Sequence, residues 1–124
     1  MYLAKEIVDF KNRSFPMAGI FNIKIKMADR LRALGYINIE VLKNNALSDK
    51  GAALRAHVFH WSYLDNVSRM ENFAYRVKKD RDNIFSDGLA KWNVLASYAH
   101  LHFGSDIRLA KNFIKNCNEY KNGK

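Results

Sequence analysis

Alternating apolar and polar positions predict a series of strands along the chain. From Phe21 to Met27 every second residue is apolar and the residues between them are asparagine or lysine, as a strand with one buried face requires. Similar patterns predict further strands at residues 36–41, 53–61 and 73–77, and one or two β segments within 89–103. The turn-rich stretch 44–51 separates two of these strands, so we expect the two to pair as neighbours.

Helical spacing is found near the start of the chain as well. Leu3, Ile7 and Val8 fall on one side of a helix over residues 1–9, and a short helical turn is expected over 28–34. Gly35 follows that turn, at a position where glycine commonly ends a helix. The charged run 78–83 is expected to be a solvated loop.

A C-terminal helix is predicted from about Asp106 to Asn118. Ser105 or Asp106 can cap it, and residues spaced by three and four form one apolar stripe: Ala110, Phe113, Ile114 and Cys117. Cys117 is the only cysteine, which excludes a disulfide within the chain and any zinc or redox site that needs two thiols. On the apolar stripe it is expected to be a buried structural thiol rather than a nucleophile.

Length and composition indicate one folded domain over residues 1–124. The chain is 48% hydrophobic and contains one proline and six glycines, which does not fit a disordered or linker-rich chain. The elements above predict an α/β fold with a mixed, largely antiparallel sheet and flanking helices. No apolar stretch approaches the ~18 residues of a membrane span, so no membrane association and a cytoplasmic location are expected.

The charge balance points to an anionic partner as one open alternative. Twenty-one Lys and Arg residues against twelve Asp and Glu give a formal net charge of +9. The basic residues are spread along the chain without an aromatic-interleaved patch, which argues against nucleic acid. A non-catalytic basic module that binds an anionic ligand remains a second interpretation.

The four histidines form two pairs, His57 with His60 and His100 with His102. Each pair lies in an apolar β-type segment, where a polar side chain costs free energy unless it has a partner. In a strand over residues 98–103, Tyr98, His100 and His102 share one face, which would line that face with groups able to transfer protons. Hydrogen-bonded core histidines and a zinc site are the alternatives, although no Cys, Asp or Glu lies beside either pair at ligand spacing.

Several segments in the right order resemble one family, the cobyrinate a,c-diamide synthases of corrinoid biosynthesis. The resemblance is to the C-terminal part of their glutamine amidotransferase domain and runs nearly the whole length. The N-terminal matches to the family pattern are Met1-Tyr2-Leu3, Asp9, Met17-Ala18-Gly19, Met27, Arg30 and Leu34-Gly35-Tyr36. Further on, the matching segments run from Arg55 to Ser62 and from Asn93 to Phe103, and they contain both histidine pairs.

The resemblance implies part of a class I amidotransferase-like, flavodoxin-like fold and a glutaminase function. In this family a cysteine thiolate attacks glutamine, and the released ammonia amidates a tetrapyrrole carboxylate that an N-terminal domain activates with ATP and Mg. By position, His100 would be the activating histidine, with His60, His102 and Tyr98 lining the site. No cofactor-binding residue is expected within this chain, because it contains neither of the glycine patterns that bind nucleotide phosphates, G-x-x-x-x-G-K-S/T and G-x-G-x-x-G. No metal-ligating residue is expected either.

Two departures from the family pattern limit what carries over. The family's Cys-Gly-Gly segment would lie directly before Met1, so the chain is expected to be a truncated part of the domain, inactive alone and without the ATP-binding domain. Val58 replaces the glutamate of the family's Glu-Phe-His segment. Loss of neighbouring strands would also leave an edge at residues 98–103 and an apolar face at 94–101 uncovered, which predicts self-association.

Overall fold

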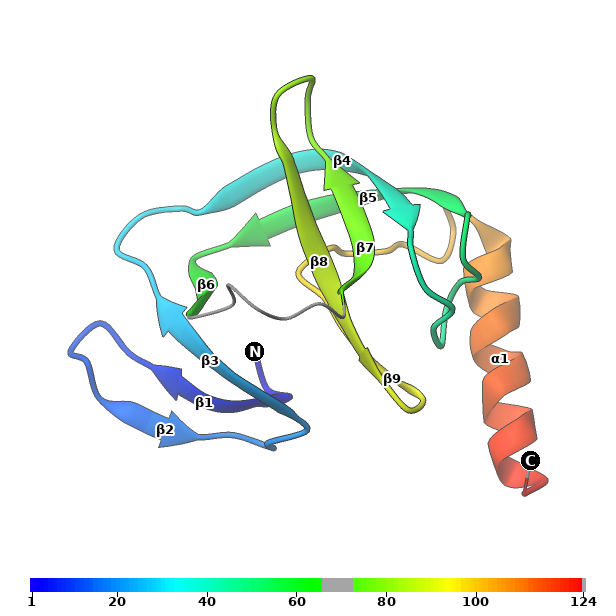
Figure 1. The fold of residues 1–124 in the computed structure, drawn as a ribbon, viewed down its shortest axis with the longest axis horizontal. Coiled ribbons are helices and arrows are strands. Elements are labelled where there is room, and N and C mark those ends of the chain that lie inside the picture. Colours follow the sequence, from blue (N-terminus) through cyan, green and yellow to red (C-terminus); the bar gives the residue numbers. More distant parts are fainter. Residues whose placement is uncertain (66–72, 124) are drawn as a thin grey trace. The chain divides into compact units, whose positions relative to one another are not determined.

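Strands are the main regular secondary structure in the computed structural model, which describes residues 1–65 and 73–123 (Figure 1). The chain forms two compact units, one containing residues 1–35 and 58–71 and the other residues 36–57 and 72–124. A four-stranded sheet belongs to the first unit and a five-stranded sheet extends through the second. The five-stranded sheet and the C-terminal helix belong to the histidine-bearing part of the chain.

The first unit is built on a mixed sheet with strand order β2-β1-β3-β6. Its central strands β1 and β3 are parallel, and the other two pairings are antiparallel. Phe21, Ile23 and Ile25 are buried, which confirms the alternation predicted for this segment. The strands are β1 (Ala4–Val8), β2 (Ser14–Pro16), β3 (Phe21–Met27) and β6 (Ser62–Asp65).

Two helical predictions in this part of the chain are wrong. The segment 1–9 contains strand β1, in which Ile7 pairs with Phe15 of β2 and Ile25 of β3. Apolar residues four positions apart share a face in a strand as well as in a helix, so spacing alone did not separate the two. The expected turn over 28–34 is also overturned, because a strand begins at Ala33. Gly35 has a φ of 124° within that strand and caps no helix.

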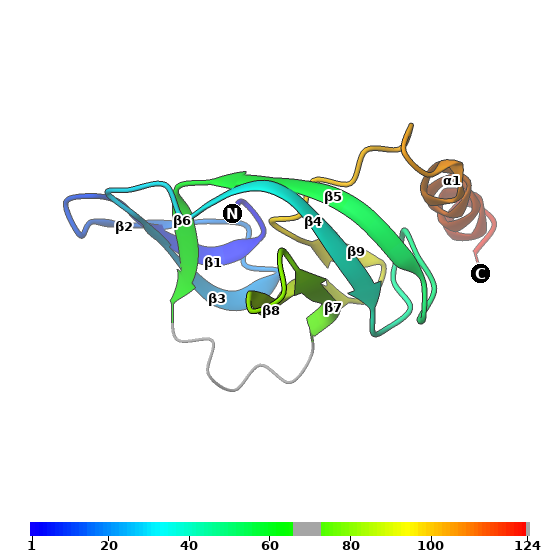
Figure 2. The ribbon, with the colours of Figure 1, turned by 90° about the horizontal axis from the view of Figure 1, so that it is seen from above.

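The second sheet has the order β5-β4-β7-β8-β9, and Figure 2 shows β4 and β5 running beside each other. The β4–β7, β7–β8 and β8–β9 pairings are antiparallel. Ile37, Ile39 and Val77 are buried along these strands and form part of the core. The strands are β4 (Ala33–Val41), β5 (Ala53–His60), β7 (Phe73–Lys78), β8 (Ile84–Lys91) and β9 (Val94–Ala96).

The predicted strands at 36–41, 53–61 and 73–77 are therefore confirmed, and the order β5-β4 confirms that the first two are neighbours. The prediction for 89–103 is correct only in its first part, because β8 ends at Lys91 and β9 ends at Ala96. Beyond that point the segment 98–103 forms a single bridge at His100 rather than a strand. The segment 98–103 is therefore not the uncovered strand edge that was expected there.

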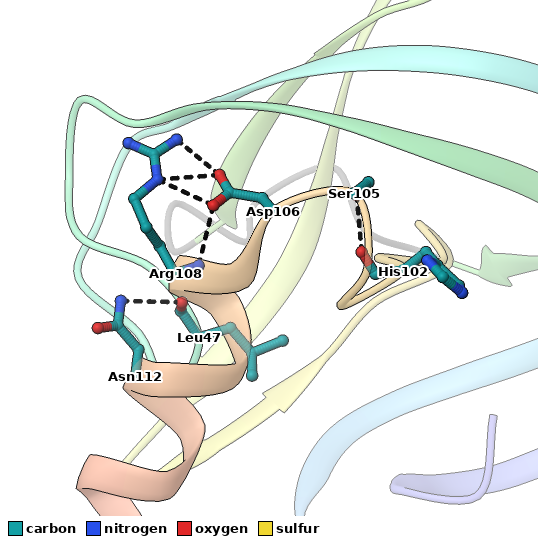
Figure 3. Close-up of polar contacts among 6 residues, drawn as sticks. All are labelled: Leu47, His102, Ser105, Asp106, Arg108 and Asn112. Atoms are coloured by element: carbon teal, nitrogen blue, oxygen red, sulfur yellow. Dashed lines mark hydrogen bonds and ion pairs between the residues drawn. The ribbon is translucent and has the colours of Figure 1, made fainter.

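The C-terminal helix α1 (Ile107–Lys121) begins as predicted. The carboxylate of Asp106 accepts a hydrogen bond from the backbone N–H of Arg108 at 3.0 Å and also holds the Arg108 guanidinium (Figure 3). These contacts with Arg108, led by its side chain, keep the pKa of Asp106 below its ordinary value. A side-chain carboxylate at this position satisfies an N–H group that the helix itself leaves without an acceptor.

The apolar stripe expected on this helix is not buried. Leu109 is the buried residue of α1, whereas Phe113, Ile114 and Cys117 are exposed. The prediction of a buried Cys117 thiol is therefore wrong, because within this chain the helix packs through its first turn and through polar contacts. The Nδ2 atoms of Asn112 and Asn116 donate to the carbonyl oxygens of Leu47 and Ala46, each at 3.1 Å (Figure 3 shows the first).

The α/β class with mixed and antiparallel sheets is confirmed, with one α-helix among the described residues. It is compatible with part of the flavodoxin-like fold that the resemblance implied. Within the same residues, no helix has the length and apolar character needed to cross a membrane.

Candidate functional site

His57 of β5 and His100 are joined through their backbones. The N–H of His100 donates to the carbonyl oxygen of His57 at 2.8 Å, and the N–H of His57 donates back at 3.2 Å. The centroids of the two imidazole rings lie 6.4 Å apart, with an angle of 38° between the ring planes. Two residues that are distant in the sequence thus present their side chains next to each other.

A pocket of about 340 Å³ opens around this pair. The ring of Tyr36, from β4, meets the His57 ring edge-on at a centroid distance of 5.4 Å. Aromatic contact of this kind restricts the orientation of the imidazole. The lining residues are Tyr36, Arg55, Ala56, His57, His100, His102 and Ser105.

His102 is held at this pocket by the turn that follows it. The hydroxyl of Ser105 donates to the carbonyl oxygen of His102 at 2.7 Å, and the Ser105 N–H donates to the same oxygen at 2.9 Å (Figure 3). Gly104 lies against the His102 ring, since a Cβ atom added to this glycine would stand 2.7 Å from a ring carbon. A residue at position 104 with a side chain would therefore overlap the His102 ring and force it to move.

Asp87 of β8 is a buried carboxylate next to the segment that leads to His100. It accepts hydrogen bonds from the Ser97 hydroxyl at 2.7 Å and from the backbone N–H groups of Tyr98 and Ala99 at 3.1 and 2.9 Å. Sequence reasoning missed this residue. The available signal was an acidic residue inside the apolar run 84–90, where an uncompensated charge would be costly.

The strand around Asp87 is packed tightly against β7. Gly88 has a φ of 75°, and a Cβ atom added there would stand 2.7 Å from a ring carbon of Tyr75. The Tyr75 side chain is fully buried, and burial is the main cause that raises the pKa of its phenol. The nearby charge of Asp87 raises that pKa further.

The sequence-predicted site residues meet different outcomes. His57, His100 and His102 line one pocket, so three of the four histidines are brought together. His60 belongs to the first unit, where its Nδ1 lies 2.8 Å from the carbonyl oxygen of Ser62. Tyr98 is half-buried and, among the described residues, is not part of the pocket lining. The common face expected for residues 98, 100 and 102 is wrong, because no strand forms there.

The side chains that line the pocket are suited to proton transfer. A neutral imidazole accepts a proton and an imidazolium donates one, both near neutral pH. No carboxylate lines the pocket, and the described residues contain no group of three or more His, Cys, Asp or Glu side chains that could hold a metal ion. Val58 of β5, at the position where the resemblance implied a glutamate, is only 1% exposed and belongs to the buried core.

The first unit carries a separate hollow of about 570 Å³. The Arg32 guanidinium lies 4.7 Å from the centre of the Tyr63 ring. Asp9 is engaged by Arg13, whose backbone N–H is the main cause that lowers the pKa of this carboxyl group. The lining residues are Asp9, Phe10, Asn12, Lys26, Met27, Ala28, Asp29, Arg30, Arg32 and Tyr63.

Comparison with known proteins shows which family this chain is similar to. Residues 1–107 match the CobB/CobQ-like glutamine amidotransferase domain. A protein named cobyrinate a,c-diamide synthase from Dehalococcoides mccartyi is 40% identical over 118 residues, which are 93% of this chain and 25% of that protein. The protein of the same name from Saccharolobus solfataricus is 39% identical over 106 residues, or 85% of this chain and 24% of that protein.

A third relative, from Leptospira interrogans, carries the same name and is 33% identical over 119 residues, covering 94% of this chain and 26% of that protein. The chain spans about a quarter of the length of these relatives. The resemblance drawn from the histidine segments is confirmed, and the chain belongs to the CobB/CobQ-like glutamine amidotransferase domain family.

Proposed function

We propose that this chain is the histidine-bearing part of a glutamine amidotransferase that amidates carboxylates of a cobyrinate-like tetrapyrrole. In this proposal His100 is the base that activates a cysteine nucleophile for glutamine hydrolysis. The observation that carries the proposal is the backbone pairing of His100 with His57, which holds the backbone of the matched histidine segment beside a pocket that the His100 side chain lines. The name that these relatives share, cobyrinate a,c-diamide synthase, supplies the substrate class.

The mechanism assigned to His100 follows from acid–base chemistry. Its imidazole accepts the thiol proton as the thiolate attacks the side-chain amide of glutamine, and it returns a proton to the departing ammonia. His57 holds His100 through the backbone, and Tyr36 restricts the His57 ring. ATP and Mg, which activate the carboxylate that ammonia attacks, belong to the ATP-binding part of the full enzyme in this proposal.

The nucleophilic thiol is proposed to come from outside these 124 residues. Cys117 is the only cysteine of the chain, and it lies exposed on α1 rather than in the pocket lining. We therefore expect the chain alone to release no glutamate from glutamine above the buffer rate. Glutamate release that disappears in Cys117→Ser would contradict this assignment and make Cys117 the nucleophile.

A chimera tests the positive part of the proposal. In this chimera the chain replaces the quarter of the Dehalococcoides mccartyi relative that it matches, and glutamate release is measured with glutamine. We expect activity in the chimera, and a loss of about 10²–10⁴-fold in kcat for His100→Asn, the usual contribution of a positioned base. Lys79→Ala, in an exposed loop, is the matched control and should retain full activity.

The outcomes of this experiment are decisive. A chimera that folds but hydrolyses no glutamine, beside an active parent relative, would overturn the proposed function. A chimera whose activity survives His100→Asn would keep the function and remove His100 from it.

The hollow of the first unit favours a second candidate function, the binding of an anionic ligand. Lys26 and Arg30 line it and, within the described part of the chain, neither side chain forms a hydrogen bond or an ion pair. Arg30 also belongs to the family pattern, so a matched arginine is left without a structural partner. Cations that no internal partner satisfies are suited to carboxylates or phosphates.

Calorimetric titration distinguishes this candidate from a purely catalytic role. We expect citrate, a small tricarboxylate, to bind the chain with an affinity that falls as salt is raised from 50 to 500 mM, because the contacts are between exposed charges. Inorganic phosphate in a parallel titration separates carboxylate from phosphate recognition. Absence of heat with both anions at low salt would reject the binding function.

A further inference from the structure

We propose that Asp87 is a positioning residue for His100, acting through the backbone of residues 97–99. The inference rests on the proposed function of His100. Asp87 is not part of the pocket lining, so it does not meet the substrate directly. Its role would be to fix where the His100 imidazole stands.

The contacts of the Asp87 carboxylate converge on three successive residues. Oδ2 accepts from the Ser97 hydroxyl at 2.7 Å, from the Ala99 N–H at 2.9 Å and from the Tyr98 N–H at 3.1 Å. Oδ1 accepts from the Tyr98 N–H at 3.2 Å. Hydrogen bonds to an ionised acceptor are stronger than those between neutral groups, so this carboxylate can hold a short segment in one conformation.

The held segment has no sheet ladder of its own. Strand β9 ends at Ala96, and the next backbone pairing is the bridge between His57 and His100. Residues 97–99 span the gap between these two anchors. Ala99 is buried, and without the carboxylate its N–H would depend on the weaker acceptor that the Ser97 hydroxyl provides at 3.0 Å.

Asp87 itself stands on a rigid support. In the β7–β8 register it is the partner of Tyr75, a fully buried residue. The next residue, Gly88, brings the backbone of β8 against the Tyr75 ring so closely that a Cβ atom would overlap it. The carboxylate is thus anchored to an inner strand of the sheet and contacts the segment before His100.

The charge of Asp87 is met by N–H and O–H donors alone. Among the described residues it forms no ion pair. An asparagine in its place keeps one acceptor oxygen but turns an NH₂ group toward donors, which removes at least one of the contacts. Asp87→Asn therefore changes the hydrogen bonding with little change in volume.

Amide hydrogen exchange of the 124-residue chain tests the positioning directly. In Asp87→Asn we expect exchange at Tyr98, Ala99 and His100 to rise at least tenfold, while exchange at Val77 in the middle of β7 stays within twofold. Asp82→Asn, an exposed carboxylate in the neighbouring loop, is the matched control and should change none of these amides. Unchanged exchange at His100 in Asp87→Asn would overturn the proposal.

A second variant covers the case in which Asp87→Asn fails to fold. Ser97→Ala removes one exposed hydroxyl that both donates to Asp87 and accepts from Ala99. We expect a three- to tenfold rise in exchange confined to residues 98–100. A chain with Ser97→Ala that exchanges like the unchanged protein would count against the proposal.

Kinetics in the chimera separate positioning from general stability. With glutamine, Asp87→Asn should lower kcat at least tenfold and leave KM within twofold, because the pocket lining is retained while the base is displaced. Equal loss in kcat and in folded fraction, or an unchanged kcat, would refute the role. If the unchanged chimera were inactive, the proposed function would fail while the exchange experiment would still decide whether Asp87 fixes His100.

Discussion

The two units of the chain each carry a hollow, and the hollows differ in how their polar groups are satisfied. In the first unit, Lys26 and Arg30 line a hollow of about 570 Å³, and their side chains have no hydrogen-bond or ion-pair partner among the described residues. In the second unit, a pocket of about 340 Å³ is lined by His57, His100 and His102. The backbones of His57 and His100 pair with each other, and the carbonyl oxygen of His102 accepts from the N–H of Ser105. Unpaired charge is suited to binding an anion, whereas fixed imidazoles are suited to moving a proton.

The largest expected effect tests the rigid support of the second pocket. Gly88→Ala places a Cβ atom 2.7 Å from the buried Tyr75 ring at a φ of 75°, and should lower the free energy of unfolding by about 3 kcal/mol or more. Gly19→Ala in the first unit is the matched control, with a φ of 72° and nothing within 4 Å of the added Cβ. It should cost only about 1–2 kcal/mol. Urea unfolding measures both, and equal losses would show that β8 has room to shift.

The next effect contrasts the cations of the two hollows. Arg30→Gln should weaken citrate binding about five- to tenfold, because it removes a cation that no internal partner holds. Arg55→Gln, in the lining of the histidine pocket, should leave citrate binding within twofold. Calorimetry with both variants checks the contrast. Equal weakening by the two substitutions would mean that net charge, and not the hollow, attracts the anion.

Acid should weaken the carboxylate contacts of both units. In the first unit a hydrogen bond from Lys24 is the main cause that lowers the pKa of Glu6, and contacts with Arg108 lower the pKa of Asp106 in the second. Because the folded pKa lies below the unfolded one, the stabilisation is present above the unfolded pKa and is lost as pH falls through the folded pKa.

We therefore expect the urea midpoint to fall below about pH 4.5, the range in which ordinary carboxyl groups take up protons. Glu6→Gln and Asp106→Asn should each make the midpoint less sensitive to acid, and the second substitution should also lower helicity at neutral pH. A midpoint that is constant from pH 6 to pH 3 would contradict the expected linkage.

The smallest effect concerns an exposed ion pair on the second sheet. Arg76 of β7 and Glu40 of β4 meet at 2.8 Å, and both side chains are more than half exposed. Such pairs contribute about 0–1 kcal/mol, so Glu40→Gln should shift the unfolding free energy by no more than about 0.5 kcal/mol. A larger loss would show that cross-strand charge supports the β4–β7 pairing more than solvent screening allows.

The sequence predicts those elements in which local pattern and tertiary packing agree. Phe21 to Met27 alternates and pairs on both sides, and Asp106 caps a helix where its side chain accepts from the backbone N–H of Arg108. The pattern fails at residues 4–8, whose apolar spacing fits both a helix and a strand. This segment is a strand because it pairs with β2 and β3. The pattern also fails for Phe113 and Cys117, because their spacing shows a stripe but not whether anything in the chain covers it.

The candidate site was predictable in its residues more than in its geometry. The histidine segments identified His100 and its neighbourhood, and the pairing of His57 with His100 confirms that the two segments meet. The strand expected at 98–103 does not form, because the carboxylate of Asp87 takes the amides of Tyr98 and Ala99 that a ladder would have used. A contact between a side chain and a distant backbone leaves no periodic signal.

The bridge between His57 and His100 also has a consequence for the order of folding. It joins β5 to a position reached only after β7, β8 and β9 have been traversed along the chain. Contacts that close long loops form slowly, since the entropy of closure is lost before they stabilise anything. During synthesis the earlier strands can pair while the histidine pocket is still open. The imidazoles should therefore be among the last groups to reach their final places.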